Sequence, residues 1–173
     1  MIPRYVISIA LMVLALTGQV HAANPLSLDE VNKLVADKYP TILHVTPKDL
    51  NDWLKPNSGK EVVLLDVREE DEFKISHLAG AKRALNIDSA LLALFGKPKN
   101  TIIVTYDSVG MRAAAIADKL TKRDFDQVYN LDGGIFAWAN EGLPMYNDTK
   151  QVHKVHPGDL WWRRYLHEDL RAW

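Results

Sequence analysis

The sequence predicts an α/β fold with three layers, in which a mostly parallel central sheet carries helices on both faces. Short apolar and β-branched runs alternate with helical patterns along the chain, and this alternation is typical of parallel sheets with helical crossovers. Residues 101–106 form the clearest strand pattern, because all six are apolar, β-branched or aromatic. The alanine-rich stretch 113–120 follows, contains no Gly or Pro, and has the composition of a helix.

The first 22 residues have the pattern of a secretory signal peptide. Arg4 precedes an apolar run at 5–16, and Val20-His21-Ala22 forms a small-residue cleavage site. A membrane anchor is the alternative, but the apolar run is shorter than the roughly 20 residues that a spanning helix needs. We therefore expect cleavage after Ala22 or Ala23 and a mature protein in the periplasm or outside the cell.

Residues 23–40 are predicted to form an N-terminal helical extension. Ser27 and Glu30 have the spacing of a capping box, an apolar stripe follows, and Pro40 ends the helix. The other elements are predicted from the same kinds of pattern: strands at 43–45, 61–67, 84–87 and 128–131, helices at 47–54, 71–75, 89–95 and 135–141, and a Pro/Gly/Ser loop at 55–60.

A six-residue loop joins the strand at 101–106 to the helix at 113–120. Successive backbone N–H groups in such a tight turn converge on one point, and the helix dipole adds positive charge there. The sequence therefore predicts an anion site made by this loop, whose residues are Asp107, Ser108, Val109, Gly110, Met111 and Arg112.

The loop and three other segments resemble a single rhodanese-like domain. Residues 65–73 are similar to the "DVR…EF" signature of that family, and 75–81 to its "GHIPGA" segment, with Ser76 in place of the usual Gly. Residues 131–138, continued by Gly142-Leu143-Pro144, are similar to its "L-x-GG-x-x-AW…G-x-P" signature. Each match alone is weak, but four in the right order indicate the family. The resemblance implies a rhodanese-like domain at 41–148.

In active rhodaneses the loop is approximately Cys-Arg-x-Gly-x-Arg, and its cysteine carries the transferred sulfur as a persulfide. Here Gly110 and Arg112 match, but Asp107 replaces the cysteine, Ser108 the first arginine and Ala113 a common serine; the chain has no cysteine at all. A carboxylate cannot attack S–S bonds and leave again as a thiolate does. The resemblance therefore implies an inactive domain with no catalytic residue and no cofactor.

Two roles remain open for Asp107, and both require a buried, ionised carboxylate. In the first, the carboxylate fills the anion site from within by accepting backbone N–H bonds. In the second, it only caps the helix that begins near Arg112. Other chemistry is disfavoured: no further carboxylate for Mg²⁺ follows, the loop is one residue shorter than in the related phosphatases, and only Gly110 matches a nucleotide-binding P-loop.

The balance of charge and the histidine spacing narrow the possible partners. The chain has 21 Lys and Arg against 22 Asp and Glu, and such a near-neutral composition gives no support for nucleic-acid binding. His153 and His156 are close in sequence, but no metal-ligand spacing surrounds them, so no metal site is expected. His77 lies in the "GHIPGA"-like segment and is expected to be a hydrogen-bonded structural residue.

Residues 149–173 are predicted to contain a Trp-rich amphipathic C-terminal helix with Asp159 as its N-cap. Packing on the domain is the favoured role, because a small protein rarely leaves several tryptophans in water. Docking of a protein partner or a second copy is the alternative. Membrane contact is the least expected role, because the charges nearly cancel. The residues available for docking are Trp161, Trp162, Leu166, Leu170 and Trp173, with Tyr165 beside them.

Together these patterns predict a catalytically inactive rhodanese-like domain that acts as a binding or regulatory module. One alternative is a sulfur-relay component that holds thiosulfate or a persulfide-bearing molecule while a partner supplies the thiol. A weaker alternative is a structural module that oligomerises through its C-terminal helix.

Overall fold

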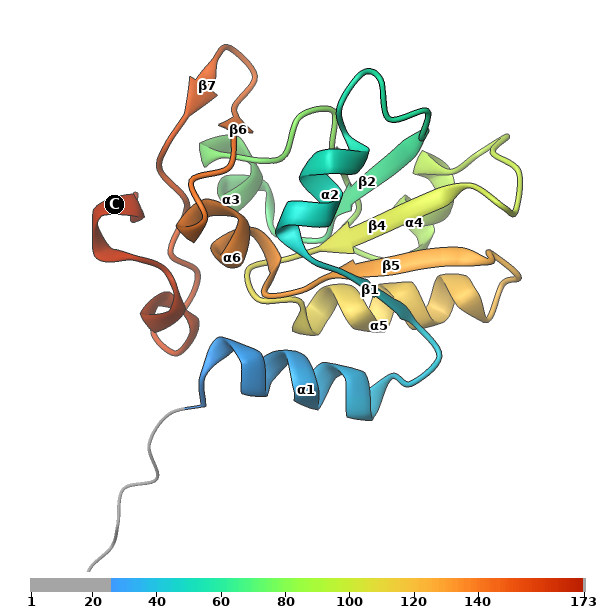
Figure 1. The fold of residues 1–173 in the computed structure, drawn as a ribbon, viewed down its shortest axis with the longest axis horizontal. Helices are drawn as coiled ribbons and strands as arrows, with labels where there is room; N and C mark the ends of the chain where they lie inside the picture. Colours follow the sequence, from blue (N-terminus) through green and yellow to red (C-terminus); the bar gives the residue numbers. More distant parts are fainter. Residues whose placement is uncertain (1–25, 173) are drawn as a thin grey trace, which may run out of the picture.

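The computed structural model describes residues 26–172, so the predicted signal peptide lies outside the described residues. Its centre is a five-stranded sheet in the order β1-β5-β4-β2-β3, and every neighbouring pair is parallel (Figure 1). No helix among residues 26–172 combines the length and apolarity needed to cross a membrane. The strands are β1 (Leu43–Val45), β2 (Val62–Asp66), β3 (Lys82–Arg83), β4 (Ile102–Tyr106) and β5 (Gln127–Leu131).

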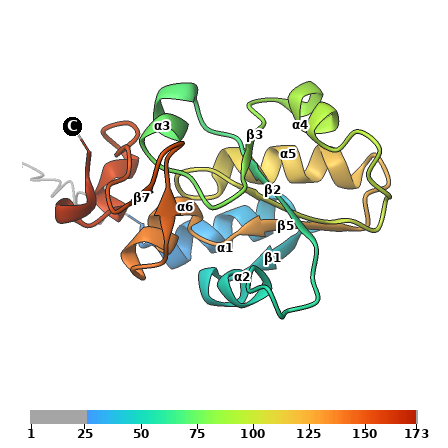
Figure 2. The ribbon, with the colours of Figure 1, turned by 90° about the horizontal axis from the view of Figure 1, so that it is seen from above.

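Helices cover both faces of this sheet, which confirms the predicted fold class (Figure 2). On one face lie α2 (Pro47–Trp53) and α6 (Gly134–Asn140), whose apolar side chains share a core with Leu64 and Val104. On the other lie α4 (Ile87–Ala93) and α5 (Met111–Thr121), which share a second core with Leu65 and Ile103. Alternate residues of β2 and β4 therefore enter opposite cores, as expected for strands buried on both sides.

The N-terminal helix α1 (Leu28–Lys38) lies beside α5 (Figure 1). Its predicted capping box is confirmed: the Ser27 amide donates to Glu30 Oε2 at 2.6 Å, and the Glu30 amide donates to Ser27 Oγ at 3.2 Å. These two bonds satisfy N–H groups that the helix itself leaves without partners.

The strand predicted at 84–87 is wrong. The edge strand is the short β3, and Ile87 already begins α4, because Asn86 caps that helix by accepting the Ser89 amide at 2.9 Å. A side chain that caps a helix binds the backbone N–H groups of the first helical turn, and this competes with the backbone pairing of a strand. The small antiparallel hairpin of β6 (Met145–Tyr146) and β7 (Gln151–Val152) was not predicted.

A buried ion pair fixes the segment between α3 (Glu70–Ile75) and β3. Arg68 Nη2 lies 2.6 Å from Asp66 Oδ2, both side chains are inaccessible to solvent, and the same nitrogen donates to the Ser76 carbonyl at 2.6 Å. Burial is the largest single influence on the pKa of Arg68 and lowers it, but the charge and hydrogen bonds of Asp66, together with the charges of Tyr106 and Glu72, raise that pKa overall. His77 is structural as predicted: its Nδ1 lies 3.0 Å from the Phe73 carbonyl, and its ring stacks on Phe73.

The C-terminal segment is not the single amphipathic helix that the sequence predicted. It forms two short 3₁₀ helices, η1 (Trp162–Tyr165) and η2 (Glu168–Leu170). Leu166 has an extended backbone between them, and the chain then folds back so that Val155 pairs with Arg171. The Arg171 guanidinium donates to the Leu166 carbonyl at 2.9 Å. Because these contacts give the backbone other partners, they replace the i→i−4 bonds of a continuous helix.

This segment packs on the domain. Leu166 is 1% exposed and Val155 is fully buried in the core that contains α6, with Trp162, Tyr165 and Leu170 partly buried against it. Asn140 of α6 donates to the Tyr165 carbonyl at 2.7 Å and accepts the His167 amide at 3.0 Å. The prediction of Asp159 as an N-cap residue is wrong, because the N-cap of η1 is Trp161; Asp159 instead accepts the Trp161 amide at 2.8 Å and the Trp162 amide at 3.0 Å in the turn before η1. Trp173 lies outside the described residues.

Candidate functional site: a self-filled loop beneath an acidic pocket

The loop after β4 is closed around the carboxylate of Asp107, which is only 2% exposed. Its Oδ1 accepts the Val109 amide at 3.0 Å and also the Gly110 amide. Its Oδ2 accepts the Arg112 amide at 2.7 Å and Arg112 Nε at 3.2 Å. The converging N–H groups of the loop are thus bound to a side chain of the same loop.

Two glycines allow this geometry. Gly110 has φ 95°, and a Cβ there would lie 2.9 Å from Asn130 Nδ2. Gly134 has φ 56°, and a Cβ there would overlap the Asp107 carbonyl and lie 2.7 Å from the Ser108 carbonyl. Because no Cβ intervenes, the first turn of α6 reaches the loop, and the Ile135 amide donates to the Asp107 carbonyl at 2.8 Å. Gly134, the second glycine of the last signature, therefore allows α6 to contact the loop.

The position of Asp107 distinguishes between its two open roles. Helix α5 begins at Met111, with Gly110 at the N-cap, so Asp107 lies three residues before the cap. A simple N-cap side chain accepts one N–H group of the first turn, whereas Asp107 accepts three backbone amides and a guanidinium nitrogen. This is the geometry of an anion site that is filled from within.

Arg112 connects the loop to helix α3. Its side chain is 47% exposed, and its Nη2 lies 3.4 Å from Glu72 Oε1 and 3.4 Å from Ser108 Oγ. Ser108 Oγ also donates to Glu72 Oε1 at 3.2 Å. Burial by itself lowers the pKa of Arg112, but the charges of Asp107 and Glu72 raise it overall, so the guanidinium stays charged. Its charge is shared between two carboxylates before any ligand arrives.

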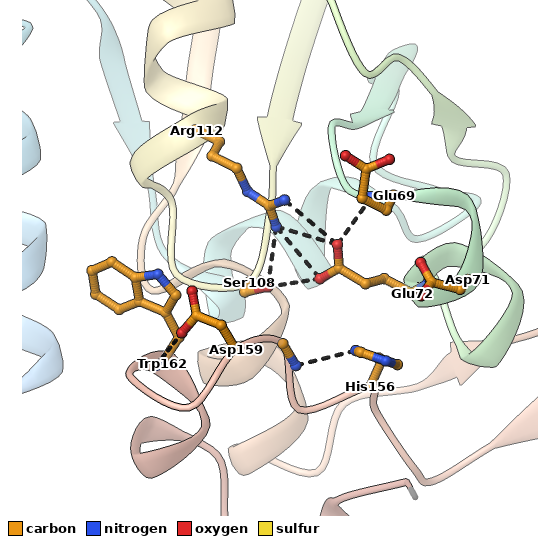
Figure 3. Close-up of a pocket in the computed structure, with 9 residues that line it drawn as sticks. Glu69, Asp71, Glu72, Ser108, Arg112, His156, Asp159 and Trp162 are labelled. Carbon is orange, nitrogen blue, oxygen red and sulfur yellow. Dashed lines mark hydrogen bonds and ion pairs between the residues drawn. The ribbon is translucent and has the colours of Figure 1, made fainter.

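A pocket of about 350 Å³ lies over the loop (Figure 3). The loop supplies Ser108 and Arg112 to it, whereas Asp107, Val109, Gly110 and Met111 are not among the residues that line it. The remaining wall residues come from the start of α3 and from the C-terminal segment: Glu69, Asp71, Glu72, His156, Gly158, Asp159 and Trp162. The structure thus brings only two of the six predicted site residues to the pocket surface.

Sequence reasoning missed Glu72 and the C-terminal wall as parts of this site. Glu72 belongs to the "DVR…EF" stretch, so its place in a known signature was the available signal. The C-terminal wall lies outside the four signatures, and its contact with the loop is tertiary: a Cβ on Gly158 would lie 3.6 Å from Ser108 Oγ.

The pocket is acidic. Four carboxylates line it, and Arg112 is its only Lys or Arg side chain. The Asp107 carboxylate adds a further negative charge beneath the floor. Like charges repel more strongly where protein surrounds them than in bulk water, so the pocket opposes the entry of small anions. Neither these carboxylates nor any other group of three or more His, Asp or Glu in residues 26–172 is arranged to hold a metal ion.

The chain belongs to the rhodanese-like domain family, which matches residues 46–141. It is 36% identical over 104 residues to the probable adenylyltransferase/sulfurtransferase MoeZ of Mycobacterium tuberculosis, a match that covers 58% of this chain and 25% of that protein. It is 33% identical over 88 residues to the uncharacterized protein YibN of Escherichia coli, covering 50% of this chain and 62% of that one. The chain thus spans less than two thirds of either relative.

Solved structures show the same fold. The thiosulfate sulfurtransferase of Pseudomonas aeruginosa matches with a TM-score of 0.53 and 30% identity, over 62% of this chain and 20% of that one. The polysulfide-sulfur transferase homodimer of Wolinella succinogenes matches with a TM-score of 0.55 and 26% identity, over 70% of this chain and 90% of that one. The domain is therefore related to sulfurtransferases.

Proposed function

We propose that this protein is a catalytically inactive rhodanese-like domain that acts as a binding or regulatory module in the periplasm or outside the cell. The observation that carries the proposal is the Asp107 carboxylate, which occupies the centre of the loop and accepts its N–H groups. The sequence holds no cysteine, so the chain has no thiol on which to carry sulfur.

The chemistry of sulfur transfer supports inactivity. The nucleophile must attack a sulfur atom, hold it as a persulfide and release it to an acceptor, which requires a polarisable thiolate. A carboxylate oxygen does not form such a bond reversibly. Both oxygens of Asp107 are also engaged in hydrogen bonds, and its side chain is shielded from solvent.

The pocket over the loop is the surface that we assign to binding. Its volume of about 350 Å³ is within the range of small-ligand pockets, and it would also accept a side chain of a partner protein. Its walls combine carboxylates with the ring of Trp162, so a neutral or cationic group fits it better than an anion does.

The location rests on the signal-peptide pattern of residues 1–22. An exported domain that needs no free thiol also has no need of a reductant to keep that thiol active. If export and cleavage occur, the mass of the protein recovered from the periplasm or medium corresponds to a chain that begins at Ala23 or Asn24. Recovery of the uncleaved chain from the membrane fraction would contradict this part of the proposal.

A sulfur-relay component is the second candidate, favoured by the named sulfurtransferases among the relatives. In that role the pocket would hold thiosulfate or a persulfide-bearing molecule, with Arg112 and Ser108 as polar contacts, while a partner supplied the thiol. The filled loop and the acidic walls oppose it. A structural module that oligomerises through the C-terminal segment is a weaker candidate, and a sizing column tests it directly.

Two measurements test the proposal, and the second, thiosulfate binding, also separates it from the relay candidate. We expect no thiocyanate formation from thiosulfate and cyanide beyond that of an Asp107→Ala control, and no heat of thiosulfate binding by calorimetry. Turnover clearly above the control would end the case for inactivity. If the natural chain binds thiosulfate and Arg112→Gln weakens that binding, the relay role is supported instead. Arg123→Gln is the matched control, because Arg123 is exposed and does not line the pocket.

A further inference from the structure

The folding of the C-terminal segment leaves an apolar surface uncovered, which we call the tail patch: Leu26, Leu160, Trp161 and Arg164, with Trp162 and Tyr165 at its base. Leu160 and Trp161 are each 72% exposed, and Leu26 is 44% exposed. Four of the five side chains that line the groove are apolar or aromatic, and Leu160 adds an exposed leucine next to Trp161 in the sequence. A contiguous apolar groove of this kind is a candidate interaction site.

The tail patch differs from the face that a continuous helix would have presented. Leu166, at the centre of the predicted apolar face, is buried in the domain core, whereas Trp161, at its edge, points to solvent. The surface that the C-terminal segment exposes is therefore not the face of the predicted helix. The near-cancellation of charge, which made membrane contact the least expected role, belonged to the predicted helix and not to the surface that the segment forms.

The position of the tail patch, next to the N-terminal segment, indicates a lipid surface as its partner. Leu26 both lines the groove of the patch and is the first described residue after the N-terminal segment. The apolar run at 5–16 ends ten residues before Leu26, a stretch of chain that reaches at most about 35 Å. If that run lies at a membrane while the domain is folded, Leu26 and the tail patch are within this reach of the same lipid surface.

The chemistry of the tail patch also fits a lipid interface. The Arg164 guanidinium lies 5.0 Å from the centre of the Trp161 ring, and its Nε donates to the Trp161 carbonyl at 2.9 Å. Tryptophan prefers the headgroup region of a bilayer, and an adjacent arginine can bind lipid phosphate.

We propose that the tail patch is a membrane-docking surface that inserts Trp161 and Leu160 into the headgroup region of a bilayer. Binding is shallow and reversible, because only a few side chains take part. Asp29 and Glu30, in the first turn of α1, carry negative charge near Leu26. Apolar contact therefore contributes most of the affinity, and anionic lipid adds a modest preference.

Co-sedimentation with vesicles tests the proposal on the chain from Ala23 onward, which contains every described residue. We use vesicles of phosphatidylcholine alone and of phosphatidylcholine mixed with phosphatidylglycerol. The natural chain is expected to bind both, and the mixed vesicles better. Trp161→Ala should lower the partition coefficient about tenfold, since much of an aromatic side chain leaves water on insertion. Arg164→Gln should remove the preference for phosphatidylglycerol.

Phe95→Ala is the matched control. Phe95 is 88% exposed and follows α4, a helix on the opposite side of the molecule from the C-terminal segment (Figure 1), so Phe95→Ala removes an exposed aromatic side chain without touching the tail patch. The proposal is supported if Trp161→Ala lowers the partition coefficient, Phe95→Ala leaves it unchanged, and all variants have the same melting temperature. It is overturned if the natural chain does not bind vesicles, if Phe95→Ala weakens binding as much as Trp161→Ala does, or if the chain is a dimer that Trp161→Ala dissociates.

Discussion

Removing the carboxylate at the centre of the loop should both destabilise the fold and create a binding site for anions. Asp107→Ala leaves the amides of Val109, Gly110 and Arg112 without their acceptor. Each unsatisfied buried donor costs about 1–3 kcal/mol, and water from the adjacent pocket recovers part of that cost. We expect a loss of about 3 kcal/mol in the free energy of unfolding. For a domain of this size, that corresponds to a melting temperature lower by about 6–12 °C.

The same variant should respond to small anions, because the N–H groups that bound Asp107 then face an open site. Formate or sulfate should raise its melting temperature in a concentration-dependent manner, whereas the natural chain should change little. Differential scanning fluorimetry measures both effects. Asp148→Ala, which removes an exposed carboxylate at the β6–β7 turn, controls for general effects of charge. A loss below about 1 kcal/mol, smaller than the cost of even one unsatisfied amide, or an equal anion response in both chains, would refute the self-filled loop.

Three further predictions follow from the loop and its supports. Asp107→Cys should yield a thiol whose pKa lies below the value of about 8.5 for free cysteine, because the loop amides stabilise the thiolate. Titration of the thiolate absorbance measures this pKa, and a value near that of free cysteine would contradict the prediction. Leu166→Ala should lower the free energy of unfolding in urea by about 3 kcal/mol. Leu160→Ala, which shortens an exposed side chain, should change that free energy little. Equal effects of the two substitutions would show that the C-terminal segment does not pack as described. Gly134→Ala should lower the free energy of unfolding by at least about 3 kcal/mol, because the new Cβ would overlap the Asp107 carbonyl. Gly142→Ala should lower it by only about 1 kcal/mol, because Gly142 also has a positive φ but has open space around it. Thermal unfolding compares the two variants, and similar losses of stability would refute the steric argument.

Local interactions explain why the sequence predicted most of the fold. The capping box of α1 lies within four consecutive residues, and β2 and β4 are each defined by their own apolar composition. The loop after β4 is equally local, because Asp107 and the three amides that it binds lie within six consecutive residues. The absence of cysteine is likewise a property of the sequence alone.

The pocket and the tail patch depend on contacts between residues far apart in the chain. Glu72 reaches Arg112 across 40 residues, and the C-terminal wall reaches the loop from a segment that no family signature covers. Helical periodicity at 159–173 predicted one amphipathic helix, but a helix pattern describes only bonds within the segment. Burial of Leu166 against α6 and pairing of Arg171 with Val155 gave that segment better partners elsewhere in the fold. The sequence by itself therefore determined the family and the replacement of the family's cysteine by Asp107. The tertiary structure decided which side chains surround the pocket and which remain exposed, because burial is a property of the packed chain.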